Sequence, residues 1–179
     1  NNPAEYEIVV TNALTGLPEY YGREMMAQDD YRLIMASSAI PVACHPVELN
    51  GVPYFDGGLT DAIPVRRALE QGCDKLVVIL SKNRDYVRKP QGMHRLYRRA
   101  CRSYPNIVDA IDRRHVVYNE NWKDVFSLER DGTAFVFAAS EPIRVGTYSM
   151  KEDAERNLYD LGLRDFAAWK NDLLEFLSI

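Results

Sequence analysis

The tripeptide Asp56-Gly57-Gly58, which follows a predicted hairpin, constrains the fold of this chain more than any other feature. Asn50-Gly51 separates the short apolar runs 47–49 and 52–55, and this pair is a strong signal for a two-residue hairpin. The hairpin delivers Asp56 to the end of its second strand. Glycine at 57 and 58 permits backbone angles that a side chain would forbid, and it lets a substrate approach the carboxylate closely. Because Asp-Gly is also a common structural turn, the tripeptide alone does not establish a site.

Hydrophobic periodicity and turn residues predict the remaining elements. We predict strands at 6–11, 76–80 and 135–138, and helices at 30–37, 64–71, 93–104, 107–126, 151–161 and 163–177, with Ser149 or Asp153 near the start of the helix at 151–161. The run at 76–80 is uniformly aliphatic, which is typical of a strand buried on both faces of a parallel sheet covered by helices. The sequence therefore predicts an α/β fold.

Four elements, in this order, resemble the C-terminal half of the catalytic domain of patatin-like phospholipases, which are Ser–Asp dyad lipid acyl hydrolases. They are the helix end Ala36-Ser37-Ser38-Ala39-Ile40-Pro41, the turn Asp56-Gly57-Gly58, the helix-starting Pro64 and the run Gly72-Cys73-Asp74 before the strand. The resemblance covers about residues 5–82. Within it, the form Asp-Gly-Gly-x-x-Asp-Ala-Ile-Pro at 56–64 resembles a bacterial subgroup of the family. It implies that residues 1–82 belong to a three-layer α/β/α domain with a mainly parallel sheet. It also implies that residues 83–179 form a mostly helical extension packed on that domain.

The resemblance further implies a chemistry. Asp56 would be the catalytic base, and Gly57 and Gly58 would shape its turn. The family's serine nucleophile, on a Gly-x-Ser-x-Gly elbow, and its oxyanion loop precede this region, and the elbow motif is absent from the 179 residues. Ser37 and Ser38 lie in the helix-ending motif, where we expect them to pack and cap. We therefore expect the N-terminal half of the same protein, upstream of Asn1, to supply the nucleophile, and this chain alone to be inactive.

A basic segment follows the resemblance. Residues 82–102 hold eight basic side chains and one acidic one, whereas the whole chain has a net charge of −4. In a helix at 93–104, four arginines would share one face. These candidates for contact with anionic headgroups are Arg95, Arg98, Arg99 and Arg102. The alternative is a solvated face, or one paired with the acidic remainder of the chain. Nucleic acid is not an expected partner, because the chain is acidic overall and shows no recognised binding motif.

The cysteines and histidines indicate neither a metal nor a cofactor. Three cysteines with no Cys-x-x-Cys pair favour reduced thiols in a cytoplasmic protein. Cys44-His45 resembles a metal or thiol site, but the chain has three histidines and no ligand spacing. His115 and Trp122 suggest either a ligand pocket or, with more support, helix packing. The longest aliphatic run, at 76–80, is far too short to span a membrane, so membrane contact would be peripheral.

Three interpretations remain open at this point. The chain is part of an esterase for lipid or other acyl esters, or a binding or regulatory module that keeps the fold without the chemistry. In the third interpretation it is an unrelated α/β interaction protein in which Asp56-Gly57-Gly58 is only a turn.

Overall fold

A computed structural model describes residues 4–143 and 152–178, and the chain divides into two compact units. Unit 1 comprises Asn1–Pro64 and Arg88–Trp122, and unit 2 comprises Val65–Val87 and Lys123–Ile179. The predicted boundary between residues 82 and 83 stays a prediction. The predicted helix start at Ser149 lies outside the described residues.

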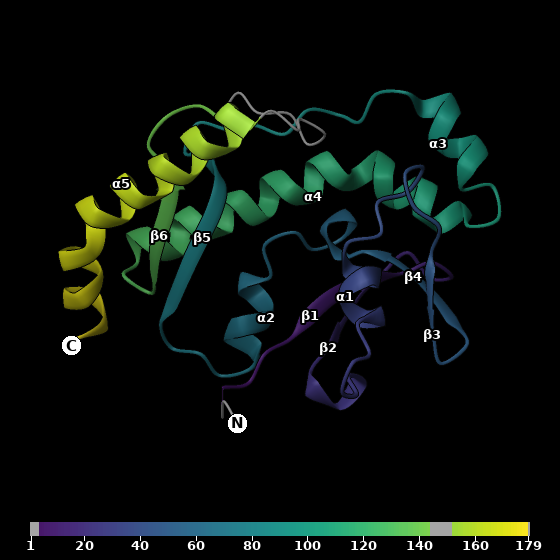
Figure 1. The fold of residues 1–179 in the computed structure, drawn as a ribbon, viewed down its shortest axis with the longest axis horizontal. Coiled ribbons are helices and arrows are strands. Elements are labelled where there is room, and N and C mark those ends of the chain that lie inside the picture. The colour runs from purple at the N-terminus through teal and green to yellow at the C-terminus, as the bar shows by residue number, and fades with distance from the viewer. Residues whose placement is uncertain (1–3, 144–151, 179) are drawn as a thin grey trace. The chain divides into compact units, whose positions relative to one another are not determined.

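A four-stranded antiparallel sheet organises unit 1, in the order β2-β1-β4-β3 (Figure 1). Its strands are β1 (Ile8–Asn12), β2 (Pro18–Tyr21), β3 (Val47–Leu49) and β4 (Val52–Asp56). Asn50 and Gly51 have φ values of 50° and 80°, as a hairpin turn with two left-handed residues requires, so the predicted hairpin is confirmed. The prediction of a mainly parallel sheet is wrong for this unit. Tight turns join β1 to β2 and β3 to β4, and such turns connect antiparallel strands.

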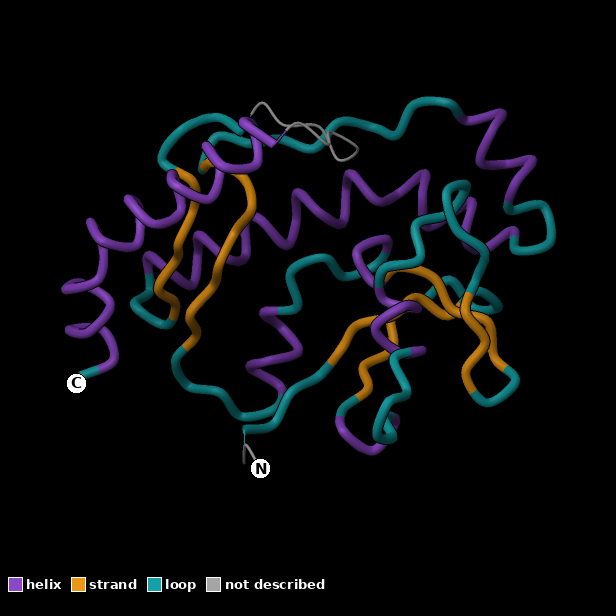
Figure 2. Tube along the Cα trace, viewed as in Figure 1, coloured by secondary structure: helices purple, strands orange, loops and turns teal. Residues whose placement is uncertain are grey.

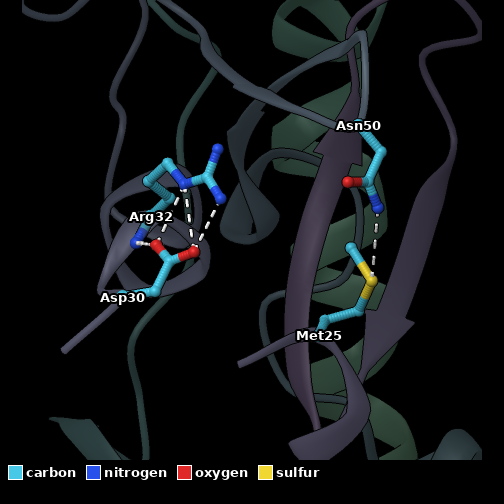
Figure 3. A network of polar contacts seen from close by, with 4 residues as sticks. All are labelled: Met25, Asp30, Arg32 and Asn50. Atoms are coloured by element: carbon cyan, nitrogen blue, oxygen red, sulfur yellow. Dashed lines mark hydrogen bonds and ion pairs between the residues drawn. The ribbon is translucent and has the colours of Figure 1, made fainter. Parts of the chain in front are cut away.

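The helical segments of unit 1 are short, apart from one long helix. They are η1 (Arg23–Met25), α1 (Arg32–Ser37), η2 (Gly57–Leu59), α3 (His94–Ala100) and the first part of α4 (Pro105–Arg130). Before α1, the Asp30 carboxylate accepts a hydrogen bond from the Arg32 backbone N–H at 3.1 Å and pairs with its guanidinium at 2.6 Å (Figure 3). Hydrogen bonds from Arg32 lower the pKa of Asp30 to about 2, so this acid stays ionised at the helix start.

The sheet of unit 1 buries apolar clusters on both faces, because successive side chains of a strand point to opposite sides. Tyr54 belongs to a cluster with α1 and Val10. Phe55 belongs to a second cluster with Leu59, and α4 contributes three residues to it: Ile107, Val108 and Ile111. The second cluster therefore joins the hairpin and its glycine turn to a helix about 50 residues further along the chain.

Unit 2 contains a pair of parallel strands, which run side by side in Figure 2. Its elements are α2 (Val65–Glu70), β5 (Leu76–Asn83), β6 (Ala134–Ala139), α5 (Glu152–Leu177) and the end of α4. The parallel pairing of β5 is confirmed, but its predicted burial on both faces is wrong for the described residues. Val77 is 43% exposed and Ile79 is 80% exposed. The helix α5 covers β6 instead, with the Phe137 and Phe166 rings 6.0 Å apart.

Three helices differ from their predictions. The predicted helix at 93–104 ends at Ala100, so Arg102 lies in the following turn. The helix α4 is longer than predicted, because Pro105 suits the first helical turn and helical geometry persists to Arg130. A single helix, α5, replaces the two predicted around Gly162. A glycine inside a helix costs only about 1 kcal/mol, which the long flanking segments outweigh.

Candidate active site

Asp56 is the last residue of β4, and its side chain turns back over the glycines that follow. Its Oδ1 accepts a hydrogen bond from the Gly58 backbone N–H at 2.8 Å, which caps the short helix η2. Its backbone is held from two sides, because its N–H donates to the Ala39 carbonyl at 3.0 Å and its carbonyl accepts from the Thr11 hydroxyl at 2.8 Å. Within the described residues, its second carboxylate oxygen, Oδ2, accepts no hydrogen bond. The half-buried carboxylate thus has one fixed oxygen and one that is available.

The two glycines after Asp56 are required for different reasons. A Cβ at Gly57 would lie 2.2 Å from the Val9 carbonyl oxygen, so the turn passes against β1 where no side chain fits. A Cβ at Gly58 would lie 3.1 Å from Oδ1 of Asp56 and 3.4 Å from Nη2 of Arg114. The first glycine permits the close approach of two backbone segments, whereas the second leaves space beside the carboxylate.

Arg114 is a neighbour of this turn that the sequence analysis missed. Its Nε–H donates to the Gly58 carbonyl at 2.7 Å, so Gly58 is bonded on both sides, to Asp56 through its N–H and to Arg114 through its oxygen. Arg114 follows Ile107 and Ile111 at helical spacing, on the face of α4 that packs against Phe55. A charged residue that continues an apolar helix face is the signal that could have identified it.

The segment after the glycines is also tied to α4. The Asn121 amide donates to Oδ1 of Asp61 at 2.7 Å and to the Ile63 carbonyl at 3.1 Å. The Tyr20 hydroxyl donates to Oδ2 of Asp61 at 2.6 Å. Both carboxylate oxygens of Asp61 therefore accept hydrogen bonds, which distinguishes this acid from Asp56.

The four candidate arginines do not meet Asp56 in any described interaction. Arg95, Arg98 and Arg99 lie on α3, all four side chains are exposed, and none forms an ion pair within residues 4–143 and 152–178. Arg99 and Arg102 line an open pocket of about 490 Å³ together with Leu96. The structure thus places two of the four arginines, Arg99 and Arg102, at one pocket. Contact with an anionic headgroup stays a prediction.

The thiols differ in accessibility. Cys44 and Cys73 are exposed, whereas Cys101 is buried in the cluster around Phe55, and burial raises the pKa of its thiol. Cys44 and His45 line a pocket of about 550 Å³ with Phe55 and Cys101. Among the described residues, no three His, Cys, Asp or Glu side chains are grouped as metal ligands would be.

His115 and Trp122, for which the sequence suggested a ligand pocket or helix packing, occupy α4. Trp122 is 7% exposed and stacks on Tyr118 at 5.6 Å between ring centroids, which supports the packing interpretation. The Nδ1 atom of His115 is buried and makes no hydrogen bond within the described part of the chain.

Comparison with known families assigns the stretch that carries Asp56. Residues 5–69 match the model of a family described as patatin-like phospholipase. This stretch belongs to that family. The patatin-like match therefore contains Asp56, Gly57, Gly58 and Asp61, and it confirms the family resemblance that the motifs predicted.

A second family model matches the C-terminal part of the chain. Residues 104–178 match a family described as a domain of unknown function (DUF6363). Arg114 and Asn121 lie in this match, so the patatin-like turn is hydrogen-bonded by residues of a segment with its own family model.

One curated protein is similar over part of the chain. It is the Uncharacterized protein YjjU of Escherichia coli (strain K12), which is 45% identical over 67 residues. The matched segment spans 37% of this chain and 19% of that protein. The patatin-like family name indicates a hydrolase acting on lipids at the level of the family. Within the described residues, no helix has the length and apolar character needed to cross a membrane.

Proposed function

We propose that this chain is part of a lipid acyl hydrolase in which Asp56 is the base of a Ser–Asp dyad. The serine nucleophile and the oxyanion loop would come from an N-terminal half of the same protein, upstream of this chain. The observation that carries the proposal is the state of the Asp56 carboxylate. Its Oδ1 is held by the turn, and its Oδ2 accepts no hydrogen bond within the described residues.

The proposed reaction is the hydrolysis of a carboxylic ester in two steps. The Asp56 carboxylate accepts the serine proton as the serine oxygen attacks the ester carbonyl. Collapse of the tetrahedral intermediate breaks the bond to the alcohol, which takes the proton back from Asp56, and an acyl-serine remains. Water then attacks the acyl-serine with the same carboxylate as base, which releases the fatty acid and restores the serine. The oxyanion donors stabilise both tetrahedral intermediates. No metal or redox cofactor enters this scheme.

A substitution that keeps the turn but removes the base tests the proposal. In the protein that carries both halves, Asp56→Asn retains an oxygen that accepts the Gly58 N–H, so the thermal midpoint should stay within about 2 °C of wild type, as for a small change in stability. Turnover of a short-chain nitrophenyl ester should fall at least ~1,000-fold, because the base is lost.

Asp61→Asn is the matched control, because Asp61 is five residues away and each of its carboxylate oxygens already accepts a hydrogen bond. It should retain most of the ester turnover. Wild-type turnover by Asp56→Asn would remove Asp56 from the mechanism. A full-length protein that lacks turnover and fluorophosphonate labelling would instead favour the non-catalytic binding or regulatory module.

The cytoplasm is the proposed compartment, with peripheral contact with membrane surfaces. Three free cysteines in the described structure support a reducing environment. The guanidinium groups of Arg95, Arg98, Arg99 and Arg102 are exposed and form no ion pair with any residue that the structure describes, which supports contact with anionic headgroups.

A further inference from the structure

The hydrogen bonds around Gly58 connect the candidate base to a cation from another part of the chain. The Gly58 N–H donates to Asp56 Oδ1 at 2.8 Å, and its carbonyl accepts from Arg114 Nε at 2.7 Å. The backbone of a single glycine is thus hydrogen-bonded both to the carboxylate and to the guanidinium. A shift of the Gly58 backbone would move the N–H that holds the Asp56 side chain.

Arg114 is itself fixed by the packing of α4. Ile107 is fully buried and Ile111 is 5% exposed in the cluster with Phe55, and Arg114 continues their face of the helix. The Arg114 side chain is half-buried, and its helix is tied a second time through Asn121 to Asp61 and Ile63. The donor that holds Gly58 therefore comes from a rigid element, which is the arrangement that positions a catalytic group reproducibly.

The geometry also brings the guanidinium to the carboxylate side of the turn. Oδ1 of Asp56 and Nη2 of Arg114 both lie within 3.4 Å of the point where a Gly58 Cβ would be. A larger side chain at position 58 would separate the two groups. The absence of a side chain at Gly58 lets the carboxylate and the guanidinium share one space.

We propose that Arg114 is a positioning residue for Asp56, and that the segment matching DUF6363 thereby completes the patatin-like active site. This inference rests on the proposed role of Asp56 as base. Arg114 would not touch the substrate. It would hold the Gly58 peptide so that Oδ1 stays bonded and Oδ2 faces the serine hydroxyl in a reactive orientation.

Arginine variants in the full-length protein test the proposal. We expect Arg114→Gln to lower kcat by ~10–100-fold, because a displacement of the order of 1 Å costs that much, while KM changes less than about twofold. Arg114→Ala should recover part of its kcat when methylguanidinium is added to the assay. Recovery by a free cation is a response that a merely structural residue would not give.

Arg113→Gln is the matched control, because Arg113 is the preceding residue on α4 and its side chain is exposed. It should have wild-type kcat with or without methylguanidinium. Hydrogen exchange of the amides at 57–60 should be faster in Arg114→Gln than in the wild type, and unchanged in Arg113→Gln.

The outcomes separate this inference from the proposed function. Wild-type kcat in Arg114→Gln, together with an inactive Asp56→Asn, would overturn the positioning role alone. An active Asp56→Asn would overturn the base, and with it this role of Arg114. If Arg114→Gln does not fold, Arg114→Lys replaces it. That variant keeps the charge without the planar guanidinium, so we expect reduced kcat at an unchanged thermal midpoint, and wild-type kcat would overturn the inference.

Discussion

The Tyr54 hydroxyl donates to Oε2 of Glu19 at 2.7 Å, although strand β1 separates their strands in the sheet. The Tyr21 hydroxyl donates to the same oxygen, and the Asn12 amide donates to Oε1 at 2.7 Å. Burial would raise the pKa of Glu19, but these hydrogen bonds together lower it. Burial, followed by the bonds to Tyr21 and Glu19, raises the pKa of Tyr54. The fold therefore requires an anionic glutamate and neutral tyrosines.

The raised pKa of Tyr54 predicts a loss of stability at alkaline pH. The stabilisation is fully present below the unfolded-state pKa of about 10 and is lost as pH rises above it, because the unfolded tyrosine ionises first. At pH 7, Tyr54→Phe should cost about 1–3 kcal/mol, since the half-buried Glu19 loses a donor. Urea unfolding from pH 7 to 11 measures both effects. Tyr159→Phe, at a 68% exposed position, is the control. An equal alkaline loss in Tyr54→Phe and wild type would contradict the assignment.

The two glycines after Asp56 should respond differently to alanine. Gly57→Ala places a Cβ 2.2 Å from the Val9 carbonyl, and we expect it to cost roughly 3 kcal/mol or more, because backbone must move. Gly58→Ala meets side-chain atoms of Asp56 and Arg114 at 3.1 and 3.4 Å, so it should retain the fold and lose esterase activity. Gly92→Ala, which meets no atom within 4 Å, is the control. Equal thermal midpoints for Gly57→Ala and Gly92→Ala would refute the close approach.

The exposed arginines predict salt-dependent binding to anionic vesicles. Replacing Arg95, Arg98, Arg99 and Arg102 with Gln should weaken sedimentation with phosphatidylglycerol vesicles and flatten its dependence on salt. Each cation near an anionic surface contributes about 1 kcal/mol. There are two controls. One is phosphatidylcholine vesicles, and the other is a variant of equal net charge in which Gln replaces Arg113, Arg130, Arg156 and Arg164. Unchanged binding across the salt series would leave the arginines as a solvated face.

The 179 residues alone should not turn over a nitrophenyl ester or react with a fluorophosphonate probe. Loss of a single oxyanion donor costs roughly 2.7–4 kcal/mol, and here both the donors and the nucleophile are expected elsewhere. Ser37 and Ser38 end α1, as predicted from their motif. Stoichiometric labelling of either serine, or of Ser149, which lies outside the described residues, would disprove the expectation. Because Val77 and Ile79 are exposed, we also expect self-association on gel filtration.

Local signals in the sequence predicted local structure well. The hairpin followed from Asn50-Gly51, and the short helix α2 followed from Pro64 and Gly72, which has a φ of 88°. These residues restrict the backbone wherever they occur, so the prediction needs no tertiary information.

Features that depend on tertiary contacts could not be read in this way. Because the run of β5 is aliphatic on both faces, it does not indicate which face is covered. In the structure Ile79 is 80% exposed. The candidate base followed from the motif, but Arg114, which bonds to its neighbour Gly58, lies 58 residues further along the chain than Asp56. Only the continuation of the Ile107 and Ile111 face by a charged residue pointed to that position.

The cluster that joins Phe55 and Leu59 to Ile107 and Ile111 has a consequence for biosynthesis. A ribosome that has just added Leu59 must add about 50 further residues before the α4 members of this cluster exist, which takes roughly 3–10 s at 5–20 residues per second. During that interval the patatin-like stretch has its hairpin but not the apolar surface that covers it. We therefore expect the nascent chain to expose apolar surface to holding chaperones, and a stop codon between the two family segments would leave that surface uncovered.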